Sequence, residues 1–346
     1  MNDNFDFNNN FQNEITMSEE ERKTHKKLFS KLGFAFLIFM LVAQGLSVVV
    51  GVVVGLINPA LLEDQNVLLV ISCVIQYLVA FPVFYLMIRN IPKRAPYKNK
   101  VDIKRFLKYG AASMFFMYVG NSISTFLMTA VATALGRVPE NSVDTVLTNT
   151  NIIISAILVG IIGPIVEELI FRKLFMDRLT VYGDVIAILL PALVFGLFHG
   201  NLYQFFYAFL LGVIFGYIYL KTGKIIYSTI LHVFINLFCG VLPSAIFSML
   251  NYDELVEILS TGAITEEYIV ANMFPLVLFM IYTYGLLAMV GVGMFVLFRN
   301  IKNIYINKGD VRFPKGTVGD IVFFNVGTIL LITSCILLIA YSTFAV

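Results

Sequence analysis

The stretch Ile162-Gly-Pro-Ile-Val-Glu-Glu-Leu-Ile-Phe-Arg172 decides how this chain is organised. It places two adjacent carboxylates and an arginine inside a run that is otherwise apolar. A charged side chain at the depth of a membrane costs at least about 2.5 kcal/mol, so such residues usually face a protein interior or a water-filled cavity. Function is therefore the default hypothesis for these three residues.

The composition describes a polytopic membrane protein. Of the 346 residues 59% are hydrophobic and only 13% are charged, which excludes a set of soluble domains. The net charge of +2 is too small to suggest a nucleic-acid partner. The three cysteines (Cys73, Cys239 and Cys335) lie far apart without metal or redox spacing, so we expect reduced packing residues.

Apolar runs long enough to cross a bilayer, about 20 residues each, recur along the chain. They cover residues 28–57, 67–88, 105–135, 151–175, 184–199, 203–220, 225–249, 274–298 and 319–344. The sequence therefore predicts an all-α, polytopic transmembrane helical bundle of about nine spans. Residues 1–27 are predicted to be a disordered polar tail, and residues 28–346 the bundle.

The charges between the runs predict the orientation. Basic residues gather before the first run and in the second, sixth and eighth loops, whereas the intervening loops are acidic or nearly neutral. By the positive-inside rule the N-terminus is cytoplasmic and the C-terminus lies outside. We expect a multi-pass protein of the cell membrane, and the Asn-, Ile- and Lys-rich composition hints at a bacterial plasma membrane.

Ionisable side chains inside the spans, apart from the span ends, are concentrated in the fourth, fifth and seventh runs. They are Glu167, Glu168, Arg172, His199 and His232. The other runs carry no comparable interior charge. This concentration predicts one shared site. If the residues only made separate polar contacts between helices, they would not need to be gathered on three spans.

Helical spacing suggests how these residues divide their roles. Glu168 and Arg172 are four residues apart, so they can pair on one face of a helix, whereas Glu167 is turned about 100° away from Glu168. We therefore expect an orienting Glu168–Arg172 ion pair and a freer carboxylate at Glu167. The same spacing places His232 with Asn236 on one helix face.

Phe195 and His199 also share a helix face, and counting residues gives their depth. Glu167 lies 16 residues before Gly183, the expected apex of a helical hairpin, and His199 lies 16 residues after it, so the two should sit at nearly the same height. His232 should lie about 12 Å from the cytoplasmic boundary. The two histidines then converge only if the hairpin projects into the cytoplasm or if the fifth and sixth spans tilt strongly, and the sequence leaves this open.

Three motifs, Glu167-Glu168-x-x-x-Arg172, Phe195-x-x-x-His199 and His232-x-x-x-Asn236, resemble in order and spacing those of the CPBP family of intramembrane proteases. That family includes type II CAAX prenyl endopeptidases and proteins linked to bacteriocin processing and self-immunity. The resemblance covers residues 151–240, the expected protease core.

The resemblance implies an endopeptidase that cleaves membrane-associated or lipidated peptides or proteins within the bilayer. It implies that Glu167 and His199 activate a water molecule and that His232 and Asn236 stabilise the oxyanion, with Glu168, Arg172 and Phe195 in supporting roles. Zinc held by one glutamate and the two histidines is an alternative, although the chain lacks the HExxH arrangement. A metal-free mechanism is favoured over it.

A second class of function stays open at this point. The same buried carboxylate and histidines could serve a proton relay in a transport protein, or belong to a non-catalytic immunity protein. Transporters often show paired halves, and no such internal symmetry is visible in this chain, which favours the enzyme.

Overall fold

The computed structural model describes residues 16–137, 141, 146–250, 258 and 264–344, and this part of the chain is helical without a β-strand. The first helices are α1 (Glu19–Ile57), α2 (Gln65–Val74), α3 (Phe81–Ile88) and α4 (Ile103–Ala134). The central ones are α6 (Ile152–Ser155), α7 (Gly163–Glu168), α8 (Asp184–Phe198), α9 (Leu202–Thr222), α10 (Ile225–Ile235) and α11 (Leu242–Phe247). The last are α13 (Glu266–Ala271), α14 (Met273–Asn300), α15 (Val318–Val322) and α16 (Val326–Phe344).

The predicted all-α polytopic bundle is confirmed. Eight helical stretches of the described chain are long and apolar enough to cross a membrane. The fifth predicted span, α8, is a shorter apolar helix of 15 residues. The predicted hairpin apex is also found, because Gly183 adopts a φ of +92° immediately before α8 begins.

Short segments of different helical pitch join these helices. The 3₁₀ turns are η1 (Pro59–Leu62), η5 (Met176–Arg178), η6 (Thr180–Tyr182) and η8 (Ile301–Asn303). The wider π-helical segments are η2 (Ile75–Ala80), η3 (Ala156–Ile162), η4 (Leu169–Phe175) and η7 (Asn236–Val241).

Prolines explain three of the four π-helical segments. Pro82, Pro164 and Pro243 each occupy the second position of the helix that follows η2, η3 and η7. Proline has no N–H, and its ring crowds the carbonyl four residues earlier, so the preceding turn widens. Such wide turns are frequent at functional sites, and here η3 and η7 adjoin the residues singled out from the sequence.

The predicted disordered tail, residues 1–27, ends too late in the sequence. Residues 1–15 lie outside the described residues, but the chain is helical from Glu19, not from residue 28. The reason is local: the Ser18 hydroxyl accepts from the Glu21 N–H at 3.2 Å, and the Glu21 carboxylate accepts from the Ser18 N–H at 2.9 Å. This reciprocal cap starts the helix within the polar segment.

The ninth predicted span, residues 319–344, is interrupted. The Asn325 side chain donates to the carbonyls of Ile321 and Val322 at 3.2 and 2.9 Å, and accepts from the Thr328 N–H at 3.0 Å. It therefore ends α15 and begins α16. Hydropathy alone does not detect a break made by one asparagine in an apolar run.

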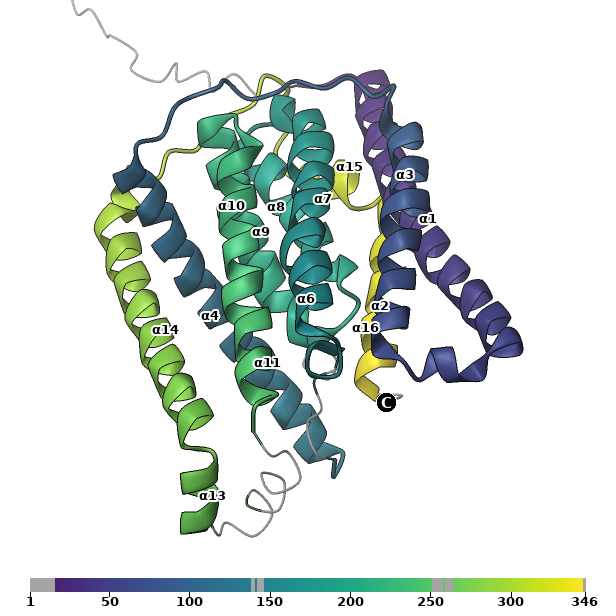
Figure 1. Cartoon of the computed structure of the whole chain (residues 1–346). Helices are drawn as coiled ribbons and strands as arrows, with labels where there is room; N and C mark the ends of the chain where they lie inside the picture. Colours follow the sequence, from purple (N-terminus) through teal and green to yellow (C-terminus); the bar gives the residue numbers. More distant parts are fainter. Residues whose placement is uncertain (1–15, 138–140, 142–145, 251–257, 259–263, 345–346) are drawn as a thin grey trace, which may run out of the picture.

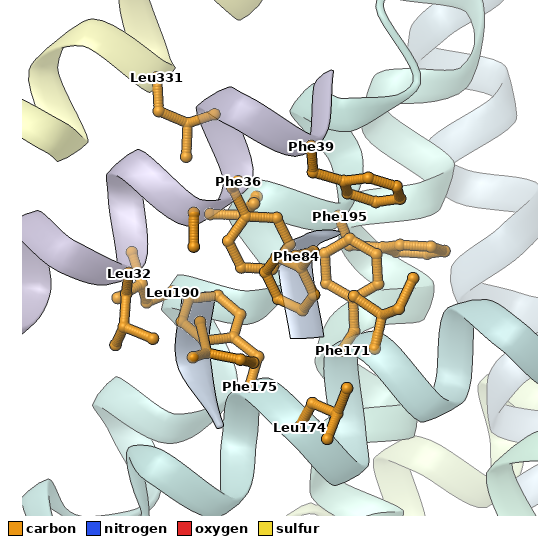
Figure 2. Close-up of a cluster of buried hydrophobic side chains, with 14 of the residues drawn as sticks. Leu32, Phe36, Phe39, Phe84, Phe171, Leu174, Phe175, Leu190, Phe195 and Leu331 are labelled. Carbon is orange, nitrogen blue, oxygen red and sulfur yellow. The ribbon is translucent and has the colours of Figure 1, made fainter. Parts of the chain in front are cut away.

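Figure 1 shows α7 to α10 in the middle of the molecule, between α1, α3 and α16 on one side and α4 and α14 on the other. The largest core lies on the side of α1. There Phe36 contacts Phe84, Phe171 and Phe175 with ring centroids 4.6, 5.5 and 4.7 Å apart (Figure 2). Phe195 of α8 belongs to the same core and links it to the polar residues of the candidate site.

Residues 304–313, here called the strap, lie over the tip of the hairpin formed by the fourth and fifth spans. The Asp184 carboxylate accepts from the Asn307 N–H at 2.8 Å, and the Val311 N–H donates to the Val181 carbonyl at 3.0 Å. Gly183 forms a β-bridge with the strap, and no room remains there for a side chain. The hairpin tip is thus covered by the strap.

An aromatic cluster joins the strap to α1. Tyr182 stacks on Phe313 with centroids 5.3 Å apart, and its hydroxyl lies 2.9 Å from Nδ1 of His25. Burial raises the pKa of Tyr182 to about 12, so this hydroxyl stays protonated at neutral pH.

The crossing of α1 and α16 depends on two glycines that face each other. A Cβ atom on Gly327 would overlap the carbonyl of Ser30, and one on Gly33 would overlap the backbone of Gly327. We expect Gly327→Ala to lower the free energy of unfolding by about 1–3 kcal/mol through overpacking, measured as thermal unfolding in detergent.

Gly285→Ala on α14 is the matched control, because no atom lies within 4 Å of the added Cβ. This change should be neutral or stabilising, by up to about 1 kcal/mol. Equal losses of stability in the two variants would contradict the close crossing.

Candidate active site

Glu168 and Arg172 form the centre of the candidate site. Both side chains are fully buried, and Nη2 of Arg172 lies 3.1 Å from Oε1 of Glu168. Glu168 ends α7 and Arg172 lies one turn later in η4, so the pair spans a change of helical pitch. The structure thus contains the ion pair that the four-residue spacing predicts.

Aromatic rings cover the Arg172 guanidinium. Its Cζ lies 5.3 Å from the ring centroid of Phe195 and 5.9 Å from that of Phe215. The described residues offer its N–H groups no well-aligned hydrogen-bond acceptor. The charge is therefore held by the carboxylate of Glu168 and by the faces of two rings.

His232 lies between the two glutamates. Its Nδ1 is 3.2 Å from Oε1 of Glu168, and its Nε2 is 3.5 Å from Oε2 of Glu167. Because the Glu168 carboxylate is paired with Arg172 and can only accept, Nδ1 of His232 carries the hydrogen in this contact. This leaves Nε2 of the same ring facing Glu167.

Glu167 is the more accessible carboxylate, with 23% of its side chain exposed, whereas Glu168 has none. The difference follows from the helix, which turns consecutive residues by about 100°. Of the two glutamates, Glu167 is thus the one that water can reach.

His199 presents a free ring nitrogen to the same region. It follows the last residue of α8, and its Nδ1 lies 2.8 Å from the Phe195 carbonyl. Because a carbonyl can only accept, Nδ1 carries the hydrogen and Nε2 keeps its lone pair. A histidine in this tautomer is suited to accept a proton or a hydrogen bond from water.

The sequence leaves open whether His199 and His232 converge, and their contacts with Phe195 show that they do. Its ring centroid lies 4.9 Å from that of His199 and 5.8 Å from that of His232. The two histidines therefore lie in one site around Phe195, and the hairpin tip is covered by the strap instead of standing free.

Asn236 is placed by η3. Its Nδ2 donates to the Val159 carbonyl at 3.0 Å, which uses one of the two N–H groups of the amide. Gly160 allows this approach, because a side chain there would overlap Leu237 of η7. The second N–H group of Asn236 is available to a ligand.

Two further residues of the site could not be identified from the sequence, because each is one aromatic residue among many. Phe215 of α9 lies over Arg172 and has its ring centroid 5.2 Å from that of His232. Tyr77 of η2 brings its hydroxyl to within 3.1 Å of the position a Cβ would occupy on Gly163, one turn before Glu167. The second span thus also borders the site.

Zinc stays a predicted alternative that no preformed metal site among the described residues supports. A zinc site needs three protein donors around one point. In the described part of the chain no three side chains of histidine, cysteine, aspartate or glutamate are grouped in this way. No step proposed for this site is therefore routed through a metal.

Comparison with known proteins agrees with the resemblance seen in the motifs. Residues 149–238 match the family model described as type II CAAX prenyl endopeptidase Rce1-like. The protein "Putative membrane peptidase YdiL" of Bacillus subtilis is 26% identical over 167 residues, covering 48% of this chain and 68% of the relative. The "UPF0177 protein YxdF" of Lactococcus lactis is 27% identical over 140 residues, covering 40% and 77%.

No solved structure matches this chain significantly. The matched segment contains all three motifs, so the predicted resemblance is confirmed at the level of the family model. The spans describe a multi-pass membrane protein, and it is similar to one bacterial protein that is named a putative membrane peptidase.

The burial of the Glu168–Arg172 pair has a measurable consequence. Arg172→Met leaves a buried carboxylate without its cation, and we expect the free energy of unfolding to fall by about 3–5 kcal/mol. Glu168→Gln combined with Arg172→Met removes both charges, so the double variant should lose less than Arg172→Met alone. Unfolding in detergent, followed by circular dichroism, measures both.

The exposed pair Glu19–Lys23 has the same four-residue spacing and serves as the control. Lys23→Met should change stability by no more than about 0.5 kcal/mol. A loss from Arg172→Met as small as that from Lys23→Met would show that the buried pair is not held as described.

Proposed function

We propose that this protein is an intramembrane endopeptidase that hydrolyses peptide bonds in membrane-associated or lipidated peptides or proteins. The observation that carries the proposal is the placement of Glu167. It is the accessible carboxylate of the site, and it faces Nε2 of His232. The match of residues 149–238 to the prenyl endopeptidase model supports the same function.

In the proposed reaction Glu167 is the general base. It takes a proton from a water molecule that also donates a hydrogen bond to Nε2 of His199, and the water oxygen attacks the peptide carbonyl carbon. Such base catalysis typically contributes roughly 10²–10⁴-fold in rate. The proton on Glu167 then passes to the leaving amine as the C–N bond breaks, which restores the carboxylate.

The oxyanion formed by the attack is assigned to His232 and Asn236. His232 is held at Nδ1 by Glu168 and donates to the oxyanion from Nε2. The second N–H of Asn236 is the other donor, because the first is used by Val159. One such donor typically lowers the barrier by about 2.7–4 kcal/mol.

In this proposal Glu168, Arg172 and Phe195 are positioning residues. Glu168 holds the His232 ring by Nδ1, and Phe195 holds the His199 ring by its carbonyl. The competing possibility, a proton-coupled transporter or an immunity protein without catalysis, would use the same buried charges without cutting a peptide bond.

Glu167→Gln tests directly whether the protein is a peptidase, or a transporter or immunity protein without catalysis. It keeps the shape of the side chain but removes the base, so cleavage should fall at least about 10²-fold while the protein remains folded. Purified protein in lipid vesicles is supplied with a farnesylated CAAX peptide. In parallel, mass spectrometry compares membrane-associated peptides from cells carrying either protein.

Glu63→Gln, at an exposed glutamate in the loop before α2, is the control and should retain full cleavage. Cleavage by the Glu167 variant at the rate of the original protein would remove the assignment. If the two proteins differ in their effect on other membrane peptides but not on the CAAX probe, the peptidase activity is supported and only the proposed substrate changes.

A further inference from the structure

A cavity of about 720 Å³ lies between α4, α8, α9 and α14, away from the polar site. Its walls come from the beginnings of α4 and α8 and the ends of α9 and α14. These ends adjoin basic loops, so the cavity lies at the cytoplasmic side in the orientation that the loop charges predict. Its volume is within the range of roughly 300–1,000 Å³ that is usual for small-molecule sites.

The interior of this cavity is mostly apolar. Ile188 and Leu189 of α8, Val213 and Ile214 of α9, and Leu297 of α14 line it, together with the aromatic rings of Phe116 and Tyr217. Leu189 is 46% exposed, so the cavity is not closed off by the protein. An apolar chain entering from the bilayer would be in contact with hydrocarbon along its whole length.

The rim is cationic, and its cations have no anionic partner among the residues that the structure describes. Lys104, Arg105 and Lys108 lie at the start of α4, and no carboxylate among the described residues is within ion-pair distance of any of them. Asp102 is also on the rim, but its carboxylate caps α4 by accepting from the Arg105 N–H at 2.8 Å. The Arg105 Nε donates to the Tyr109 hydroxyl at 3.0 Å, which keeps the guanidinium at the cavity.

The position of these cations is unfavourable without a ligand. The N-terminus of a helix carries a partial positive charge, and its first turn normally favours carboxylates. The first turn of α4 contains no acidic residue, but it contains Lys104 and Arg105. A bound anion would be stabilised by the side chains and by the N–H groups of this turn that the Asp102 carboxylate does not occupy.

The cavity is separated from the candidate active site by α9. Phe215 points to Arg172 and His232, whereas its neighbours Val213 and Ile214 face the cavity. Phe215 itself is completely buried. An occupant of the cavity is therefore not positioned to react with a water molecule at Glu167, so a substrate is not the expected ligand.

We propose that this cavity binds a phospholipid with an anionic headgroup, taken from the cytoplasmic leaflet. The phosphate lies among Lys104, Arg105 and Lys108, with Asn303 beside it, and one acyl chain enters between α8 and α14. Basic pockets between helices at the cytoplasmic face are the sites at which proteins hold acidic lipids. This inference does not depend on the proposed peptidase activity.

The absence of tryptophan from the chain makes a direct test practical. Leu297→Trp places a single fluorophore on the cavity wall. The variant is reconstituted in vesicles of phosphatidylcholine that contain a small fraction of brominated lipid, which quenches tryptophan on contact. Brominated phosphatidylglycerol should quench at a lower mole fraction than brominated phosphatidylcholine.

The charge dependence is tested in the same background. Lys104→Gln with Lys108→Gln should weaken the preference for phosphatidylglycerol roughly fivefold for each lysine removed. Lys93→Gln with Lys98→Gln removes two exposed lysines of the preceding loop and should leave the preference intact. Phe298→Trp, whose site is 63% exposed toward lipid, should show little preference between the two headgroups.

Equal quenching of the Leu297→Trp variant by the two lipids, or a preference that survives loss of both rim lysines, would overturn the proposal. So would displacement of the brominated lipid by millimolar inorganic phosphate, which would indicate a simple anion site. If Leu297→Trp does not fold, native mass spectrometry of the unmodified protein and of the rim variant, released from mixed-lipid nanodiscs, gives the same comparison. The unmodified protein should retain phosphatidylglycerol, and the variant should lose it.

Discussion

The fully buried contact between Glu168 and Arg172 is the constraint to which the central helices are fitted. An unpaired charge at this depth would cost several kcal/mol, so every element around the pair contributes to holding it. The α8 and α9 helices cover the guanidinium with Phe195 and Phe215, and α10 brings His232 to the carboxylate. The neighbouring carboxylate, Glu167, is left at the accessible border of the same cluster. A structural pair and a candidate catalytic base thus occupy consecutive positions of one helix, and the requirements of the first fix the place of the second.

Much of this arrangement can be predicted from the sequence, because its causes are local or are set by the membrane. The apolar runs predict the spans, the four-residue spacing predicts the Glu168–Arg172 pair, and the cost of buried charge predicts that three spans meet at one site. The predictions that the structure corrects also have identifiable physical causes. The cap at Ser18 starts α1 inside a polar segment, and the side chain of Asn325 divides the last run in two. Phe215 could not be singled out, because its role depends on the three-dimensional neighbours of an uncharged ring. The meeting of His199 with His232 could not be derived from depth alone, because it is made through the ring of Phe195.

The two faces of α9 contact different environments. Phe215 faces a compact group of charges in the protein interior, while Val213 and Ile214 face a mostly apolar cavity. Prolines play a comparable part in the adjoining spans. Pro164 and Pro243 follow the wide turns η3 and η7, and between these turns Asn236 reaches the Val159 carbonyl. Wide helical turns thus adjoin the paired glutamates and Asn236, whereas α14, which packs on α4 and lines the cavity, is a regular helix along its length.

The strap also fixes an order of events in the life of the chain. Asn307 binds Asp184 across a separation of 123 residues, so the ribosome delivers every motif residue, from Glu167 to Asn236, before the segment that closes over their hairpin. The residues of the charged cluster are therefore synthesised while the hairpin tip is still uncovered. The strap can close only after these helices have been made, and a polypeptide released before that point would contain the complete set of motifs with an uncovered hairpin tip.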